Sequence, residues 1–126
     1  MPVRIVDASA LGALVFGEPK AEEIAKTLGD SPMAAPALIW FELASVCLRK
    51  IKAHSAQRDQ ILSAFLMAGK LAIEIVEVDH WAVVNLADET GLTTYDASYL
   101  WLAGHLKGEL MTLDGKMQKA AKSLYL

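Results

Sequence analysis

Four acidic residues of this chain lie where a carboxylate could take part in chemistry: Asp7, Glu42, Asp96 and Asp114. Asp7 and Asp96 each begin a copy of the pentapeptide Asp-Ala-Ser-X-Leu, and each copy stands at the start of a helix-like pattern. Asp114 repeats the arrangement of Asp7, because it also follows an apolar run and precedes a helical pattern. We therefore expect the aspartates to share one local geometry and one site.

A simpler role exists for each aspartate, because Asp is among the preferred N-cap residues of helices. Glu42 is different, since it lies about six residues inside a helix predicted to open at Pro36. At about 100° per residue, this helix has one polar stripe about 80° wide. The stripe contains Glu42, Ser45, Arg49 and Lys52. Arg49 lies about 10 Å along the axis from Glu42, too far for the usual ion pair between neighbouring helical turns.

Two explanations for Glu42 stay open at this point. The stripe could simply face solvent, or Glu42 could face the aspartates that follow the strands. Four carboxylates at one place would repel each other by about 4 kcal/mol per pair, at about 4 Å and an effective dielectric of about 20. Protonation or a bound hard cation such as Mg²⁺ or Mn²⁺ would offset this repulsion. The acids therefore favour a metal-dependent hydrolase.

The composition limits the classes of protein to consider. The 126 residues fit a single domain, residues 1–126, with 54% apolar residues, a net charge of −3 and one cysteine, Cys47. The longest uncharged run, residues 31–41, is far shorter than the roughly 20 residues that span a bilayer, so we expect no membrane association. Asp7 comes too early for a signal peptide, and a cytoplasmic location is expected. The negative charge argues against broad phosphate neutralisation, but a nuclease that reaches phosphates through cations stays possible.

Short apolar runs alternate with helical patterns along the chain, which predicts an α/β fold. About seven helices should flank a central, mostly parallel sheet of four or five short strands. Strands are expected at residues 3–6, 33–35, 72–78, 109–112 and 124–126. Helices are expected at about residues 8–16, 20–28, 36–52, 56–68, 80–90 and 97–107, with a short one near the C-terminus. Ligands bind beyond the carboxyl ends of such strands, where Asp7 and Asp114 should lie.

The order of the acidic segments resembles a known family. Four segments carry the resemblance: Ile5-Val6-Asp7-Ala8-Ser9, Pro36 to Glu42, Thr94-Tyr95-Asp96-Ala97-Ser98-Tyr99, and Thr112-Leu113-Asp114. Each is weak alone, but their order, spacing and the total length are specific together. Over essentially its whole length, the chain looks like a PIN-domain ribonuclease, specifically the toxin of a VapBC-type (type II) toxin-antitoxin pair.

This resemblance implies a metal-dependent endoribonuclease that hydrolyses RNA phosphodiester bonds with Mg²⁺ or Mn²⁺. By resemblance, the catalytic and metal-binding residues are Asp7, Glu42, Asp96 and Asp114, and the supporting hydroxyl residues are Ser9 and Thr112. Asp7 and Asp96 would be the central ligands, and Glu42 a ligand or a base. A cognate antitoxin protein and a homodimer are implied as well. From the residues themselves, Arg49 is the best candidate for binding RNA, because its guanidinium can hold a phosphate through two hydrogen bonds.

Two other classes of function stay open. A receiver-like phosphoacceptor signalling domain is also a small α/β fold with aspartates after its strands. It usually needs adjacent acids, however, and Asp7 is flanked by Val6 and Ala8. A non-catalytic α/β interaction module would use the aspartates only as helix caps. A haloacid-dehalogenase-like phosphatase is disfavoured because Ser9 replaces its second aspartate, and a Rossmann-type binder lacks its glycine loop.

Overall fold

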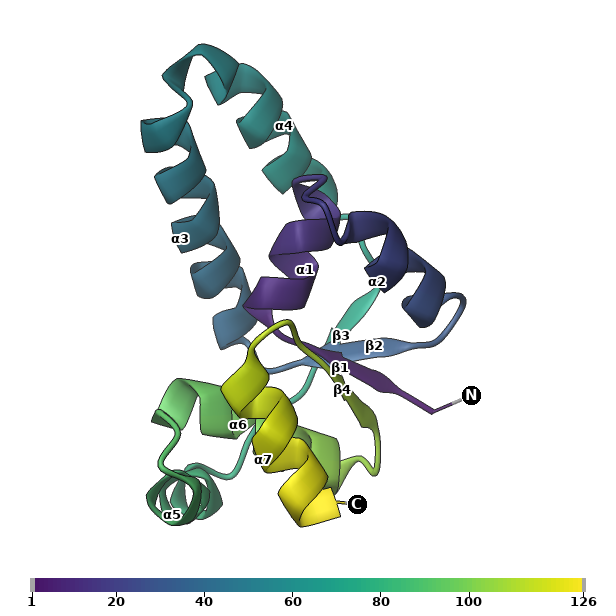
Figure 1. Cartoon of the computed structure of the whole chain (residues 1–126), viewed down its shortest axis with the longest axis vertical. Coiled ribbons are helices and arrows are strands. Elements are labelled where there is room, and N and C mark those ends of the chain that lie inside the picture. The colour runs from purple at the N-terminus through teal and green to yellow at the C-terminus, as the bar shows by residue number, and fades with distance from the viewer. Residues whose placement is uncertain (1, 126) are drawn as a thin grey trace.

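The computed structural model describes residues 2–125 and shows a parallel sheet with helices on both sides (Figure 1). Its strands are β1 (Arg4–Val6), β2 (Met33–Ala35), β3 (Ile73–Ile75) and β4 (Glu109–Met111). They lie in the order β3-β2-β1-β4, and every neighbouring pair is parallel. The predicted α/β class, with four or five strands in a mostly parallel sheet, is confirmed.

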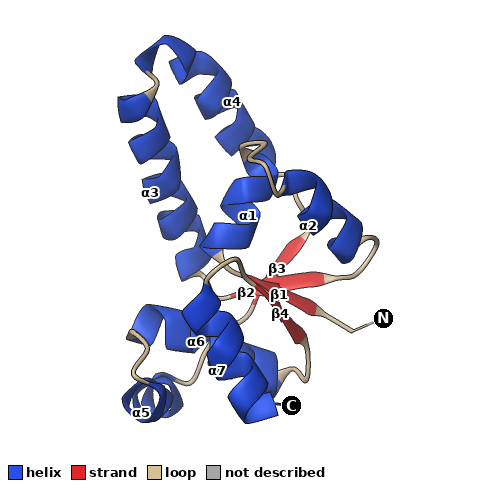
Figure 2. Ribbon diagram, in the orientation of Figure 1, coloured by secondary structure: helices blue, strands red, loops and turns tan. Residues whose placement is uncertain are grey.

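Seven α-helices flank the sheet within residues 2–125, also as predicted. They are α1 (Ala8–Val15), α2 (Ala21–Leu28), α3 (Leu38–Ala53), α4 (Arg58–Ala68), α5 (His80–Thr90), α6 (Thr94–His105) and α7 (Gly115–Tyr125), with a short 3₁₀-helix, η1 (Ser55–Gln57), before α4. In Figure 2, α1 to α4 lie on one side of the sheet and α5 to α7 on the other. Helices α3 and α4 form a hairpin that extends away from the sheet. None of the helices in this described range is long and apolar enough to cross a membrane.

The two inner strands consist mostly of apolar residues, as expected where helices cover both faces of a sheet. Ile5 and Val6 of β1 are buried, as are Ala34 and Ala35 of β2. Helix α6 packs directly against β1 and also against α5 and α7. Its fully buried side chains include Tyr99, Leu100 and Leu102. The first turn of α6 is thereby held close to the residues that follow β1.

Helix α6 begins three residues earlier than the sequence pattern predicts. Its N-cap is Thr93, whose Oγ1 accepts a hydrogen bond of 3.1 Å from the backbone N–H of Asp96. A side-chain cap at this position satisfies a backbone donor that the helix cannot pair, so the helix extends back to Thr94. The predicted start at residue 97 is therefore wrong. Asp96 is the third residue of the helix, inside its first turn.

The C-terminal segment also differs from its prediction. Leu124 and Tyr125 belong to α7, so the strand predicted at residues 124–126 is wrong for these two, and Leu126 lies outside the described residues. The Tyr125 hydroxyl donates a 3.0 Å hydrogen bond to the Leu100 carbonyl, which ties α7 to α6. Gly104 permits this contact, because a Cβ there would lie 2.5 Å from the Tyr125 hydroxyl oxygen. Helix α7 therefore continues through Leu124 and Tyr125, because the contact of Tyr125 with α6 stabilises the helix where the apolar residues alone predicted a strand.

Candidate acidic active site

Asp7 and Asp114 lie beyond the carboxyl ends of two neighbouring strands, as predicted. Asp7 directly follows β1 and Asp114 comes three residues after β4. The Asp7 backbone N–H donates a 3.2 Å hydrogen bond to the Met111 carbonyl of β4. Each aspartate caps the next helix: Asp7 Oδ1 accepts from the N–H of Ala10 at 3.0 Å, and Asp114 Oδ1 accepts from that of Met117 at 3.1 Å. The shared arrangement of these two acids is confirmed.

The two predicted hydroxyl residues, Ser9 and Thr112, both contact the Asp7 carboxylate. Ser9 Oγ donates a 2.7 Å hydrogen bond to Asp7 Oδ1, and Thr112 Oγ1 donates to Asp7 Oδ2. Thr112 Oγ1 also accepts a 3.0 Å hydrogen bond from the backbone N–H of Asp114. Asp7 and Thr112 are buried. The Asp7 carboxylate is therefore held rigidly, with hydrogen-bond donors on both of its oxygens.

The two copies of Asp-Ala-Ser-X-Leu have different structures. Asp7 precedes its helix, whereas Asp96 lies inside the first turn of α6. Ser9 donates to the Asp7 carboxylate, but Ser98 Oγ donates a 2.6 Å hydrogen bond to the backbone carbonyl of Tyr95. The expectation that the two copies share one local geometry is therefore wrong. It also follows that Asp96 caps no helix.

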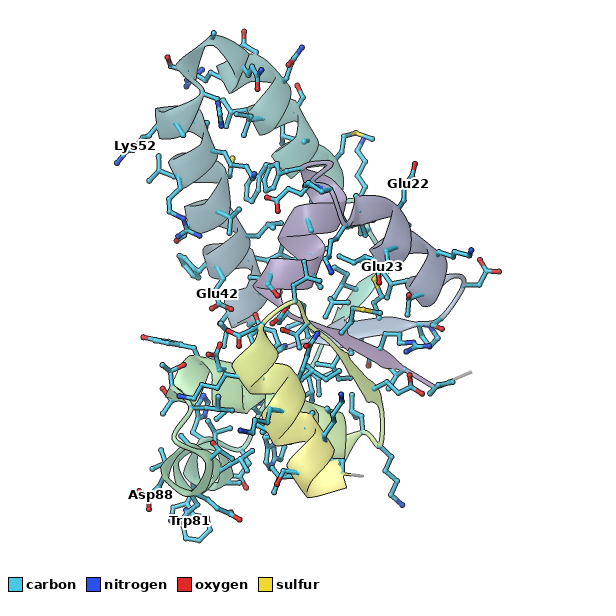
Figure 3. All side chains as sticks on the ribbon, in the orientation of Figure 1. Glu22, Glu23, Glu42, Lys52, Trp81 and Asp88 are labelled. Carbon is cyan, nitrogen blue, oxygen red and sulfur yellow. The ribbon has the colours of Figure 1, made fainter. Side chains whose placement is uncertain are left out.

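Glu42 reaches the site from α3, which begins just after the carboxyl end of β2. Figure 3 shows Glu42 near the end of α3 that adjoins the sheet, with Lys52 toward the other end. Glu42 Oε1 accepts a 2.5 Å hydrogen bond from the Tyr99 hydroxyl of α6, and Tyr99 is only 1% exposed. Of the polar stripe on this helix, Ser45, Arg49 and Lys52 are exposed to solvent, as the first explanation expected. Glu42 is half-buried instead, so exposure to solvent does not account for it.

Tyr99 is a residue of the site that the sequence analysis did not identify. Burial raises the pKa of its hydroxyl well above the ordinary value, and the hydrogen bond to Glu42 and the charges of Glu42, Asp7 and Asp96 raise it further. Tyr99 is therefore a neutral hydrogen-bond donor at any physiological pH. No pattern in the sequence links Tyr99 with Glu42, because 57 positions separate them and only the fold brings this part of α3 close to α6.

The charges of the four acids act on one another. Burial raises the pKa of the Glu42 carboxyl, the hydrogen bond from Tyr99 lowers it, and the charges of Asp96 and Asp7 raise it again, with a net increase. Burial also raises the pKa of Asp96, and so do the charges of Asp114 and Asp7. These interactions place Asp7, Glu42, Asp96 and Asp114 in one electrostatic cluster, which we call the acidic cluster.

Two basic residues differ in how they relate to this cluster. The Lys116 charge lowers the pKa of Asp96, against the larger effects of burial and the other acids. Lys116 Nζ also donates a 2.9 Å hydrogen bond to the Gly91 carbonyl, which holds this amine near the cluster. Arg49, the predicted RNA-binding residue, is exposed on α3, two turns beyond Glu42. Arg49 therefore lies outside the acidic cluster, whereas the charge of Lys116 affects the pKa of one of its acids, Asp96.

The chemistry of the acidic cluster fits a hard divalent cation. Its side-chain donors are carboxylate and hydroxyl oxygens, the type that Mg²⁺, Mn²⁺ and Ca²⁺ prefer. A cation would also stabilise the charged forms of Glu42 and Asp96, whose pKa values are raised by burial and by the neighbouring acids. Among residues 2–125, however, no three acidic, histidine or cysteine side chains are arranged closely enough to hold a metal ion. The four-carboxylate metal site therefore stays a prediction.

Comparison with known proteins identifies the family and the fold. A model of the PIN domain family matches residues 4–123. A similar fold is found in the crystal structure of PAE2754 from Pyrobaculum aerophilum, with a TM-score of 0.76 and 24% sequence identity over 96% of this chain and 86% of that one. At this identity, the likeness concerns the fold alone. No curated protein matches the chain significantly.

Proposed function

The chain belongs to the PIN-domain family, whose members are typically metal-dependent nucleases, and we propose that it is a Mg²⁺- or Mn²⁺-dependent endoribonuclease. One observation carries the proposal. Glu42 and Asp96 cap no helix, yet burial and, to a smaller extent, the charges of neighbouring acids raise the pKa values of both carboxyl groups. Such an arrangement costs stability unless a cation is bound, and perturbed acids of this kind gather at functional sites.

Each acid of the cluster would have its own part in holding the cation. Asp7 is fixed by Ser9 and Thr112, so its carboxylate needs little ordering on binding. Tyr99 orients Glu42 through one oxygen and leaves the other available. Asp96 and Asp114 complete the set from α6 and from the residues after β4. A divalent cation bound by these acids would supply an activated water and stabilise the charge on the phosphate that is attacked.

Two variants of the acidic cluster test this function. We expect purified wild-type protein to cleave single-stranded RNA in Mn²⁺ or Mg²⁺ and to lose this activity in EDTA. Glu42→Gln and Asp96→Asn should fold normally and lose metal-dependent cleavage. Asp59→Asn is the matched control, because its carboxylate is 98% exposed on α4. Full activity in both cluster variants would rule out the proposed site.

We propose further that the protein is the toxin of a type II toxin-antitoxin pair and acts as a homodimer in the cytoplasm. The residues that resemble VapBC-type toxins and the membership of the PIN family support this role. Controlled expression of the wild type should arrest growth, whereas Asp96→Asn should not. A cognate antitoxin protein should restore growth and copurify with the chain. Light scattering on the purified protein measures the oligomeric state.

The two competing functions explain less of the structure. A receiver-like domain of the flavodoxin-like class has the strand order 2-1-3-4-5, which differs from β3-β2-β1-β4. A non-catalytic interaction module accounts for Asp7 and Asp114 as helix caps. It accounts for Asp96 as an acid in the first turn of α6, but it gives no reason for the half-buried Glu42, which lies inside α3. A metal-dependent nuclease accounts for all four acids.

A further inference from the structure

Two exposed aromatic residues stand directly before two acids of the acidic cluster. Phe41 precedes Glu42 on α3, and Tyr95 precedes Asp96 on α6. Phe41 is 83% exposed and Tyr95 is 64% exposed. Neighbouring exposed aromatic side chains beside a polar site are typical of surfaces that bind another molecule.

The two rings line one pocket. Leu38, Phe41, Glu42 and Ser45 form one face of the first two turns of α3, because they are spaced by three or four residues. Tyr95, in the first turn of α6, completes the lining. The pocket has a volume of about 390 Å³. Since Glu42 belongs to both the pocket and the acidic cluster, a molecule in the pocket would lie directly beside that cluster.

The lining and the charge of the protein point to the kind of molecule that fits. The lining offers two aromatic rings, one aliphatic side chain, a hydroxyl and a carboxylate, which suits a planar ring with polar edges. The protein has a net charge of −3, so it gains little affinity by attracting phosphates. Stacking of a base on an aromatic ring supplies affinity that does not depend on that charge.

We propose that Phe41 and Tyr95 form a stacking subsite for one unpaired nucleobase beside the phosphate that is cleaved, an inference that rests on the proposed ribonuclease function. A base inside a duplex is stacked on its neighbours and cannot reach these side chains. The substrate class is therefore single-stranded RNA or an RNA loop. The polar Ser45 and Glu42 side chains face the edge of the base and contribute to base preference.

A contact between two copies of the chain is the competing occupant of this surface. Such a contact would remove water from the half-buried Glu42 carboxylate and from the neighbouring acids. Burying carboxylates without a cationic partner is costly, and none of the residues that line the pocket is basic. A single base covers much less surface, and hydrogen-bond donors on its edge can replace the water at the Glu42 carboxylate. The charge of the site thus favours a base over a second copy.

Binding of short fluorescein-labelled oligonucleotides, followed by fluorescence anisotropy in Ca²⁺, tests the subsite. One probe is a single-stranded RNA of mixed sequence, and the other has the same backbone without bases. Phe41→Ala and Tyr95→Ala should each weaken binding of the RNA about tenfold and leave binding of the baseless probe unchanged. Tyr95→Phe should keep the wild-type affinity, because it keeps the ring. Trp81→Ala is the matched control, since Trp81 is 78% exposed on α5 and lies well apart from Glu42 (Figure 3).

Three results would overturn the subsite. The alanine variants could bind the RNA as tightly as the wild type, they could lose the same affinity for both probes, or light scattering could show that they have become monomers while the wild type is a dimer. Cleavage of RNA by the wild type in Mn²⁺ separates the two proposals. If the wild type cleaves and Phe41→Ala and Tyr95→Ala bind normally, only the subsite is wrong. If the wild type neither binds nor cleaves RNA, the ribonuclease function itself is wrong.

Discussion

The Tyr99 hydroxyl donates a 2.5 Å hydrogen bond to Glu42 Oε1, and this bond joins α6 to α3 at the acidic cluster. Tyr99 is fully buried, so the surrounding core fixes its ring and holds its hydroxyl oxygen in one position. Glu42, in the first half of α3, has three rotatable side-chain bonds and would not be held in one position without a partner. The bond therefore transfers the rigidity of the core to a carboxylate that the proposed reaction needs.

Removal of this hydroxyl should lower activity more than stability. Tyr99→Phe keeps the buried ring but leaves Glu42 free to rotate. We expect the cleavage rate in Mn²⁺ to fall about 10- to 100-fold, the usual effect of losing a partner that orients a metal ligand. The free energy of unfolding should fall by only about 1 kcal/mol, because water can reach the half-exposed Glu42. Single-turnover cleavage and urea denaturation measure the two effects.

Tyr125→Phe is the matched control for this prediction. The Tyr125 hydroxyl also bridges two helices, with its hydrogen bond to the Leu100 carbonyl, but no acid of the cluster takes part. This variant should lose a similar small amount of stability and keep the full cleavage rate. Equal loss of activity in both variants would mean that Tyr99 acts only through the stability of the fold.

The acidic cluster should make the metal-free protein less stable as the pH rises. Folding raises the pKa values of Glu42 and Asp96, so the folded state binds these protons more tightly than the unfolded chain. Stability from such groups is present below the unfolded pKa of about 4 and is lost as the pH rises through the folded pKa. We expect Glu42→Gln and Asp96→Asn to melt at higher temperature than the wild type in EDTA near neutral pH, and at a similar temperature near pH 4.

Solvent screening should keep this gain small, at about 1 kcal/mol or less, because both carboxyl groups are partly exposed. Thermal melting of wild type and variants at a series of pH values gives the difference directly. Asp59→Asn is the control, since this carboxylate is 98% exposed on α4 and lies outside the acidic cluster, and the variant should melt like the wild type throughout the series. A difference that does not change with pH would contradict the raised pKa values.

Asp7 should respond to substitution in the opposite direction. Its carboxylate caps α1 and accepts hydrogen bonds from Ser9 and Thr112, so substitution removes contacts that hold the folded state together. Asp7→Ala should lower the free energy of unfolding by about 2–4 kcal/mol, from the lost cap and the lost hydrogen bonds to a charged group. Asp114→Ala, which removes an exposed cap, should cost only about 1 kcal/mol. Urea denaturation of the two variants provides the comparison, and equal losses would contradict the structural role of Asp7.

The parts of the fold and site that could be predicted are those that depend on local sequence. An apolar run followed by an acid places Asp7 and Asp114 after β1 and β4, and parallel pairing then puts them at one edge of the sheet. Glu42 could be singled out because a helical wheel shows no intrahelical partner for it. These inferences need only periodicity and the topology of an α/β sheet.

The errors arose where a distant residue or a competing cap decides the structure. Asp96 and Asp7 begin the same pentapeptide pattern, but Thr93 stands three residues before Asp96 and Arg4 three residues before Asp7. Threonine can cap a helix at that spacing and arginine cannot, so the signal was in the sequence. The Tyr99–Glu42 bond had no such signal, because it depends on where the fold places α3 relative to α6.

Arg49 should contribute to RNA binding without contributing to the chemical step. It is exposed on α3, about 10 Å along the helix axis from Glu42, where it can reach a phosphate next to the cleaved one. Arg49→Ala should weaken binding of single-stranded RNA regardless of sequence and reduce the slope of log affinity against log salt by about one. The cleavage rate at saturating RNA and the melting temperature should not change. Arg58→Ala, at another exposed arginine, is the control and should keep the wild-type slope. An unchanged slope in Arg49→Ala, measured by anisotropy over a series of salt concentrations, would show that Arg49 does not contact a phosphate.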